Sequence, residues 1–132
     1  GQSAMTVEFA AMNSSTCQSY PFAFDGKEID WRPMMRAIVE DVRDGHSRPD
    51  IAAKFHNTLV EMMIQVASHV GESAVLLTGG CFQNRLLSER AISRLSEAGF
   101  TPYWHHHIPP NDGGIAVGQI MAALKQIQMK ER

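Results

Sequence analysis

A glycine turn at residues 78–84 is the part of the chain best suited to binding chemistry. Gly79 and Gly80 let the backbone turn sharply and, because they lack side chains, let another molecule approach it closely. A strand is predicted before this turn, and an amphipathic helix that ends at Gly99 is predicted after it. Free N–H groups and the positive end of the helix dipole then gather at one place. This arrangement indicates a candidate site for a phosphate or another anion, without identifying the ligand.

A second turn, at residues 107–114, follows the next predicted strand and precedes the last predicted helix. Ligands of α/β layers gather at the carboxyl ends of the strands. If the two strands are parallel neighbours, both turns open at the same sheet edge, and Asn84 and Asp112 face one cavity. Two simpler interpretations stay open. Asp112 is well suited to capping the last helix, and Asn84 is a first-turn residue that binds nothing.

Cysteine and histidine side chains near the turns are weaker candidates. Cys81 lies where a thiol can become reactive, but a small buried side chain is the preferred interpretation, because cysteine is among the most buried residue types. His105, His106 and His107 cannot converge on one metal ion, because successive side chains of a strand alternate between its faces. His56 lies in a long helical pattern and is predicted to be at the core edge or on the surface.

Helices and strands alternate from residue 51 onward, and they position both turns. The continuous apolar run at residues 74–77 predicts a strand that is covered on both faces of a sheet. The last helix is predicted to turn its apolar side chains inward. Strands that are joined through a helix pair in parallel, so the expected class is α/β with a short, mainly parallel sheet flanked by helices. The predicted elements are a helix at 51–70, a strand at 74–77, a helix ending before 99, a strand at 101–106 and a helix at 115–129.

The first fifty residues predict smaller elements. A helix is expected at residues 4–12, and the alternation at residues 20–24 suits a short edge strand. Asp25 and Gly26 form a strong turn signal. Asp30 is then predicted to cap a helix that starts at Trp31.

Composition limits the classes of function. The chain has 132 residues, of which 44% are apolar and 20% are charged, as expected for one globular domain. A net charge of −2 predicts no long-range attraction to nucleic acid or to anionic lipid. No apolar run approaches the roughly 18 residues of a membrane span, and the first residues lack the basic start and the apolar stretch of a secretory signal, so a cytoplasmic location is expected. The chain starts without a methionine, and we expect it to be a piece of a longer protein.

Four segments together resemble a known family. TGGCFQNRLLSER followed by PPNDGGIAVGQ is similar to the C-terminal end of the HypF carbamoyltransferases of nickel–iron hydrogenase maturation, and GQSAMTVEFAA and AAKFHNTL resemble earlier segments of the same family. The resemblance implies that residues 1–132 are a single domain, the C-terminal portion of a two-lobed, actin-like and ribonuclease-H-like ATP-binding domain. TsaD-type tRNA threonylcarbamoyl transferases share this domain.

The resemblance also implies an activity and its site. The family takes a carbamoyl-adenylate made from ATP and passes the carbamoyl group to the C-terminal cysteine of the partner HypE, for cyanide-ligand synthesis. By position, Gly79, Gly80 and Asn84 match its nucleotide-binding residues, and Asp112 matches an aspartate that helps to hold a divalent metal ion.

Departures from the family pattern lead to further expectations. The other metal ligands and the first nucleotide-binding lobe lie outside this chain, so the chain alone is expected to be inactive. Whether it binds nucleotide or metal by itself stays open. Its open sheet edge predicts a homo-oligomer. Two alternatives stay open, namely a non-catalytic interaction module of the same fold and a fragment of a TsaD-type enzyme. The TsaD-type branch has a TDNGA-like turn where this chain has residues 110–114, which favours the HypF branch.

Overall fold

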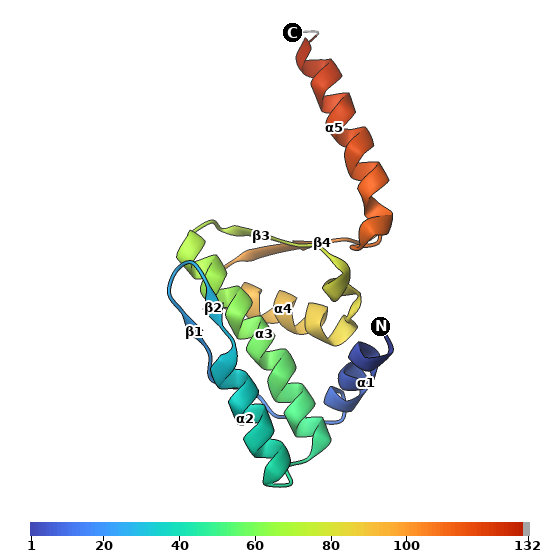
Figure 1. The fold of residues 1–132 in the computed structure, drawn as a ribbon. Coiled ribbons are helices and arrows are strands. Elements are labelled where there is room, and N and C mark those ends of the chain that lie inside the picture. The colour runs from blue at the N-terminus through green and yellow to red at the C-terminus, as the bar shows by residue number, and fades with distance from the viewer. Residues whose placement is uncertain (131–132) are drawn as a thin grey trace.

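Helices pack against one face of a small parallel sheet in the computed structural model, which describes residues 1–130 (Figure 1). The predicted α/β class, with a short parallel sheet flanked by helices, is confirmed. The elements in chain order are α1 (Gln2–Ala11), β1 (Ala23–Phe24), β2 (Ile29–Asp30), α2 (Arg32–Arg43), α3 (Arg48–Val70), β3 (Ala74–Leu77), the 3₁₀ turn η1 (Gly80–Gln83), α4 (Arg85–Glu97), β4 (Thr101–Trp104), the 3₁₀ turn η2 (Asp112–Gly114) and α5 (Ile115–Lys130).

β3 and β4 pair in parallel, as predicted, with Ala74 opposite Thr101 and Leu77 opposite Trp104. Leu77 is buried against α3 and α4, whereas the side chain of Leu76 points to the opposite face and is 65% exposed. The prediction that this strand is covered on both faces is therefore wrong for this chain. The apolar run reflects a strand type that is buried on both faces, but the described residues cover only one of them.

The core lies between α3 and α4. Apolar residues at helical spacing on the two helices meet beneath β3, which explains why two amphipathic helices and one strand pack together. Ser47 begins α3 by accepting a hydrogen bond from Asp50 N, and Gly71 ends it at a φ of +78°, which favours glycine. The buried residues of this core are Val60, Ala67, Leu77, Leu87, Ala91 and Leu95.

The N-terminal elements pack on α3 and include two corrections. The strand predicted at residues 20–24 is reduced to Ala23–Phe24, because Tyr20 N donates to the Thr58 hydroxyl rather than to a strand. α2 begins at Arg32, one residue later than predicted. Asp30 belongs to β2 and does not occupy the helix cap, although its carboxylate accepts a hydrogen bond from Arg32 N at 3.0 Å. The turn signal at residues 25–26 is confirmed, since β1 and β2 pair antiparallel across it.

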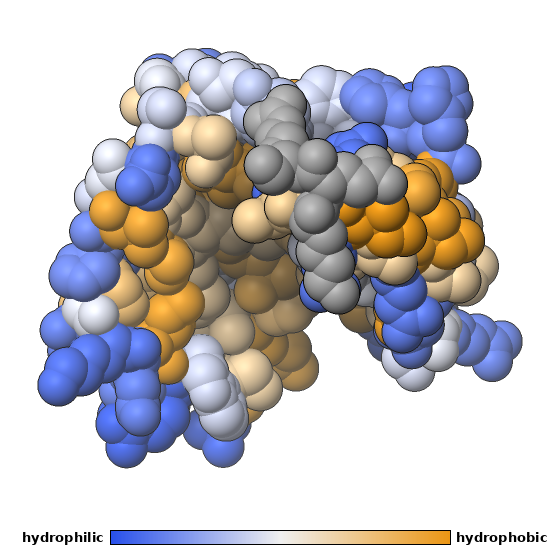
Figure 2. Space-filling view, turned by 90° about the horizontal axis from the view of Figure 1, so that it is seen from above, coloured by the Kyte–Doolittle hydropathy of each residue, from blue (hydrophilic) through white to orange (hydrophobic). Residues whose placement is uncertain are grey.

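α5 projects away from the other helices (Figure 1). Its apolar side chains are exposed, including Ile120 at 60% and Leu124 at 48%, so the prediction that they face inward is wrong for this chain. Seen from above, hydrophobic residues surround a hollow on this side of the molecule (Figure 2). A groove of about 450 Å³ between α3 and β3 is lined mainly by apolar residues, among them Val66 and Val75. Within residues 1–130, no helix is long and apolar enough to cross a membrane.

Candidate functional site

The two turns meet at one edge of the sheet, as the parallel pairing predicts. Gly79 N donates to the carbonyl oxygen of Pro110 at 2.7 Å, and His105 Nε2 lies 2.9 Å from the Thr78 hydroxyl. Gly79 has a φ of +107°, a backbone conformation that is strained for any residue with a side chain. A Cβ atom on Gly80 would lie 3.9 Å from the Cβ atom of Asn111, which is an ordinary contact. The sequence therefore located both turns correctly at the same edge.

Asn84 is the N-cap of α4. Its Oδ1 accepts from Leu87 N at 2.8 Å, and its Nδ2 lies 2.9 Å from Nε2 of His56 in α3. His56 is only 2% exposed, which is deeper than the predicted core edge or surface position. Asn84 thus has a structural role in the turn whether or not it also binds a ligand.

Glu8 is a residue of this region that sequence reasoning missed. It lies on α1 and is buried, and its carboxylate accepts a hydrogen bond from Leu86 N at 3.2 Å. Glu8 and Asn84 together therefore occupy the amides of Leu86 and Leu87, which the sequence predicted to be free. That part of the anion-site prediction is wrong, because the protein supplies its own acceptors and a negative charge at this helix end. The only available signal was that Glu8 lies within the first segment that resembles the family.

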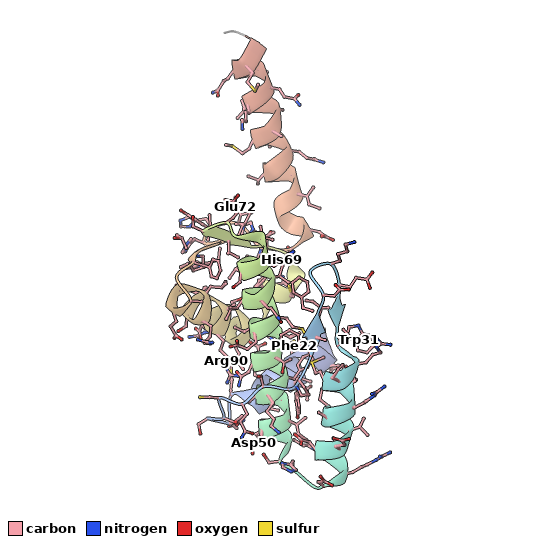
Figure 3. All side chains as sticks on the ribbon, turned by 90° about the vertical axis from the view of Figure 1, so that its left-hand side faces the viewer. Phe22, Trp31, Asp50, His69, Glu72 and Arg90 are labelled. Carbon is pink, nitrogen blue, oxygen red and sulfur yellow. The ribbon has the colours of Figure 1, made fainter. Side chains whose placement is uncertain are left out.

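Arg90 attaches the middle of α4 to α3 (Figure 3). Its guanidinium donates to the carbonyl oxygen of Ala53 at 3.2 Å and to Asn57 Oδ1 at 2.6 Å. Burial lowers the pKa of this guanidinium. The two neutral acceptors satisfy some of its N–H donors. Arg90 thus holds the middle of α4 against α3, and the bond between Asn84 and His56 holds its start and the turn before it.

Asp112 is exposed and begins η2. The cap of this 3₁₀ turn is Asn111, whose Oδ1 accepts from Gly113 N at 3.0 Å, and the capping of the last helix by Asp112 stays a prediction. Among the described residues, no three His, Cys, Asp or Glu side chains are grouped closely enough to hold a metal ion. A divalent ion needs several ligands, so the described side chains do not form a metal site by themselves.

A groove of about 720 Å³ adjoins the first turn. It lies between α1, α3 and the start of α4, and Asn84, His56 and Gly80 contribute to its wall. Asp112 is not among the lining residues, so the structure brings Asn84 and Asp112 to one sheet edge but does not place Asp112 in this groove. Cys81 also lines the groove and is exposed, in contrast to the predicted buried thiol.

Comparison with known proteins agrees with the fold and the motifs. The family model for the second subdomain of the Kae1-like domain of carbamoyltransferases matches residues 1–119. The carbamoyltransferase HypF of Synechocystis sp. is 41% identical over 97% of this chain, and that of Rhizobium leguminosarum is 33% identical over 99%. The chain spans 17% of the length of each of these relatives. A tRNA N6-adenosine threonylcarbamoyltransferase of Methanopyrus kandleri is 26% identical over 71% of the chain and is covered over 28% of its own length.

Solved structures give the same result. A crystal structure of full-length HypF in a phosphate- and nucleotide-bound form aligns with 96% of this chain and 18% of its own, at a TM-score of 0.87 and 38% identity. HypF of T. kodakarensis aligns with 91% of this chain and 16% of its own, at a TM-score of 0.76 and 26% identity. The family suggested by the two turn motifs is thus confirmed. The chain belongs to the HypF carbamoyltransferase family, in which it corresponds to the second subdomain of the Kae1-like domain.

Proposed function

We propose that this chain supplies part of the nucleotide site of a carbamoyltransferase. The complete protein would transfer a carbamoyl group from carbamoyl-adenylate to the C-terminal cysteine of a HypE-type partner, as a step in the synthesis of the hydrogenase cyanide ligands. Family membership supports this proposal. A solved relative is described as nucleotide-bound, which favours the same class of ligand here.

The hydrogen bond between Gly79 N and the carbonyl oxygen of Pro110 is the observation that carries the proposal. It joins the two motif turns into one surface at the carboxyl edge of the sheet, where ligands of α/β folds bind. In this proposal Gly79 and Gly80 let the nucleotide approach the backbone, and Asn84 offers its side-chain amide.

The proposal assigns one metal ligand to this chain. Asp112 offers a single exposed carboxylate, and the described residues do not complete the coordination of a divalent ion. The remaining ligands, and the first lobe of the domain, would come from parts of the longer protein outside this chain. We therefore propose that the isolated chain lacks transferase activity.

Calorimetric titration with a non-hydrolysable ATP analogue, with and without magnesium, tests the nucleotide site. Gly80→Ala is the informative variant, because the added methyl group meets only an ordinary contact in the fold but occupies the space that a ligand needs. Asn84→Ser keeps an oxygen that can cap α4 and removes the amide. We expect both variants to weaken binding, and Ser96→Ala at the other end of α4 to leave it unchanged. Equal binding by Gly80→Ala and the unmodified chain would contradict the proposal.

A non-catalytic interaction module is the second candidate, and the exposed apolar side chains of α5 favour it. In that case the chain would associate through those side chains, and no nucleotide would bind at millimolar concentration. The tRNA-modifying branch has less support, since the relative from that branch is 26% identical whereas the HypF relative is 41% identical.

A further inference from the structure

His56 and Asn84 link the backbones of two helices through one chain of hydrogen bonds. His56 Nδ1 lies 2.8 Å from the carbonyl oxygen of Ala52 in α3. His56 Nε2 lies 2.9 Å from Asn84 Nδ2, and Asn84 Oδ1 lies 2.8 Å from Leu87 N in α4. The imidazole is buried, whereas Asn84 is partly exposed at the wall of the groove. The chain of bonds therefore runs from the protein interior to the candidate site.

The two ends of this chain determine the direction of every bond in it. The backbone N–H of Leu87 can only donate, so the Asn84 side chain must turn its oxygen to α4 and its NH₂ group to His56. His56 Nε2 must then be unprotonated and accept. The proton lies on Nδ1, which donates to the carbonyl oxygen of Ala52, an atom that can only accept. One neutral tautomer of His56 satisfies the whole arrangement.

We propose that His56 is a positioning residue that fixes the side-chain amide of Asn84 for ligand binding, an inference that rests on the proposed nucleotide site. The cap on α4 holds the amide oxygen, and His56 holds the amide nitrogen, so the two contacts together fix the amide plane. A side-chain amide has two N–H donors and an oxygen with two lone pairs. The protein uses one donor and one lone pair. Asn84 can therefore offer one N–H and one lone pair to a ligand group such as a hydroxyl, which both accepts and donates.

Two substitutions separate this role from simple packing. In His56→Gln the side-chain oxygen can take the place of Nε2 and accept from Asn84, but the donor to Ala52 is lost. In His56→Asn the side-chain nitrogen can take the place of Nδ1 and donate to Ala52, but nothing reaches Asn84. Both variants leave space around a buried position, so thermal unfolding of both measures the packing cost that they share.

We expect His56→Gln to bind the ATP analogue within about twofold of the unmodified chain and His56→Asn to bind it about fivefold more weakly, as for loss of one hydrogen bond. Equal loss in both variants would mean that His56 acts through packing alone. Unchanged binding in both would likewise overturn the proposal.

Nitrogen NMR of the ¹⁵N-labelled chain tests the orientation without any nucleotide. We expect an unprotonated Nε2 of His56 that is coupled to Nδ2 of Asn84 across the hydrogen bond, and a protonated Nδ1. A protonated Nε2 would overturn the proposal even if nucleotide binds. If the unmodified chain binds no nucleotide, the proposed function fails, and the nitrogen signals still decide whether His56 orients Asn84.

Discussion

The α3–α4 pair and α5 differ in what covers their apolar side chains, although all three helices have apolar residues at helical spacing. On α3 and α4, Val60 and Leu95 are buried against each other's helix and against β3. On α5, Ile120 and Leu124 remain exposed, and its main contact among the described elements is with η2 (Figure 1). Amphipathic spacing thus predicts a helix and its apolar side, but not whether the partner lies in the same chain.

The difference follows from how each helix is connected. α3, β3, α4 and β4 are joined by short turns and pack against one another. α5 follows the second turn, and its main contact among the described elements is with η2, in a chain that spans 17% of the length of these relatives. Burial of apolar surface is non-directional, so α5 can be covered by any apolar surface of matching shape.

Removing a core side chain from the α3–α4 pair tests this difference with the largest expected effect. Leu95→Ala leaves a cavity at a position that is 0% exposed, and we expect a loss of about 2–5 kcal/mol in the free energy of unfolding. Leu124→Ala on α5 should cost less than about 0.5 kcal/mol at protein concentrations low enough to keep the chain monomeric, as at an exposed site. Urea unfolding of both variants measures these losses. Similar losses for the two leucines would show that α5 is packed in solution and would break the comparison.

Association through α5 is the next largest effect. We expect the chain to form a homo-oligomer that covers the exposed side chains of α5, and Ile120→Lys to weaken association at least tenfold, or about 1.4 kcal/mol. Gln119→Lys adds the same charge on the same helix without removing an apolar side chain, and it serves as the control. Sedimentation equilibrium over a range of concentrations gives the association constants. A chain that stays monomeric at high concentration would contradict this expectation.

Acid stability tests the polar contact that joins α2 to α3 in the packed part of the molecule. Lys54 Nζ lies 2.6 Å from Asp41 Oδ2, and Tyr20 donates to the same oxygen at 2.7 Å. The hydrogen bonds from Lys54 and Tyr20 hold the pKa of the Asp41 carboxyl below its usual value. Because the folded pKa is depressed, the stabilisation is complete above the unfolded pKa of about 3.9 and is lost as pH falls through the folded pKa.

In Asp41→Asn, the free energy of unfolding should therefore fall less as pH is lowered from about 5 to about 2, a range that brackets the unfolded pKa of the carboxyl. Urea unfolding at several pH values measures this change. Asp44→Asn, at an exposed position at the end of the same helix, is the control. An unaltered pH dependence in Asp41→Asn would mean that Asp41 does not contribute to acid stability.

An exposed ion pair on α4 should have the smallest effect. Arg85 Nε lies 2.7 Å from Glu89 Oε1, but both side chains are mostly exposed to water. Glu89→Gln should therefore cost less than about 0.5 kcal/mol, because solvent and salt screen such a pair. Urea unfolding at low and high salt measures it. A loss above about 1 kcal/mol, beyond the usual range for exposed pairs, would mean that this pair helps to hold the start of α4.

Local features of the fold were largely predictable from the sequence. The strand at residues 74–77 has the predicted bounds, and its parallel pairing follows from the helix that connects it to the next strand. The contact between Gly79 and Pro110 follows in turn from parallel pairing, because the carboxyl ends of neighbouring parallel strands share one edge. The family was also predictable, since both turn motifs are contiguous in the sequence.

The polar contacts at the site were not predictable in this way. Glu8 and Leu86 are 78 residues apart, and His56 and Asn84 are 28 residues apart. No periodicity or turn signal relates such positions, so only the packing of α1 and α3 against the start of α4 shows that these side chains meet.

The sequence by itself determined the helices, the paired strands β3 and β4, the order in which they follow one another, the positions of both turns and the family. These depend on neighbouring residues, because hydrogen bonds within helices and turns, and the spacing of apolar side chains, are local. Only the tertiary structure decided that the first amides of α4 already have acceptors and that His56 is buried behind Asn84. It also decided that α5 lies apart from the core. Each of these depends on which distant surface reaches a given side chain, and the order of residues along the chain does not specify that.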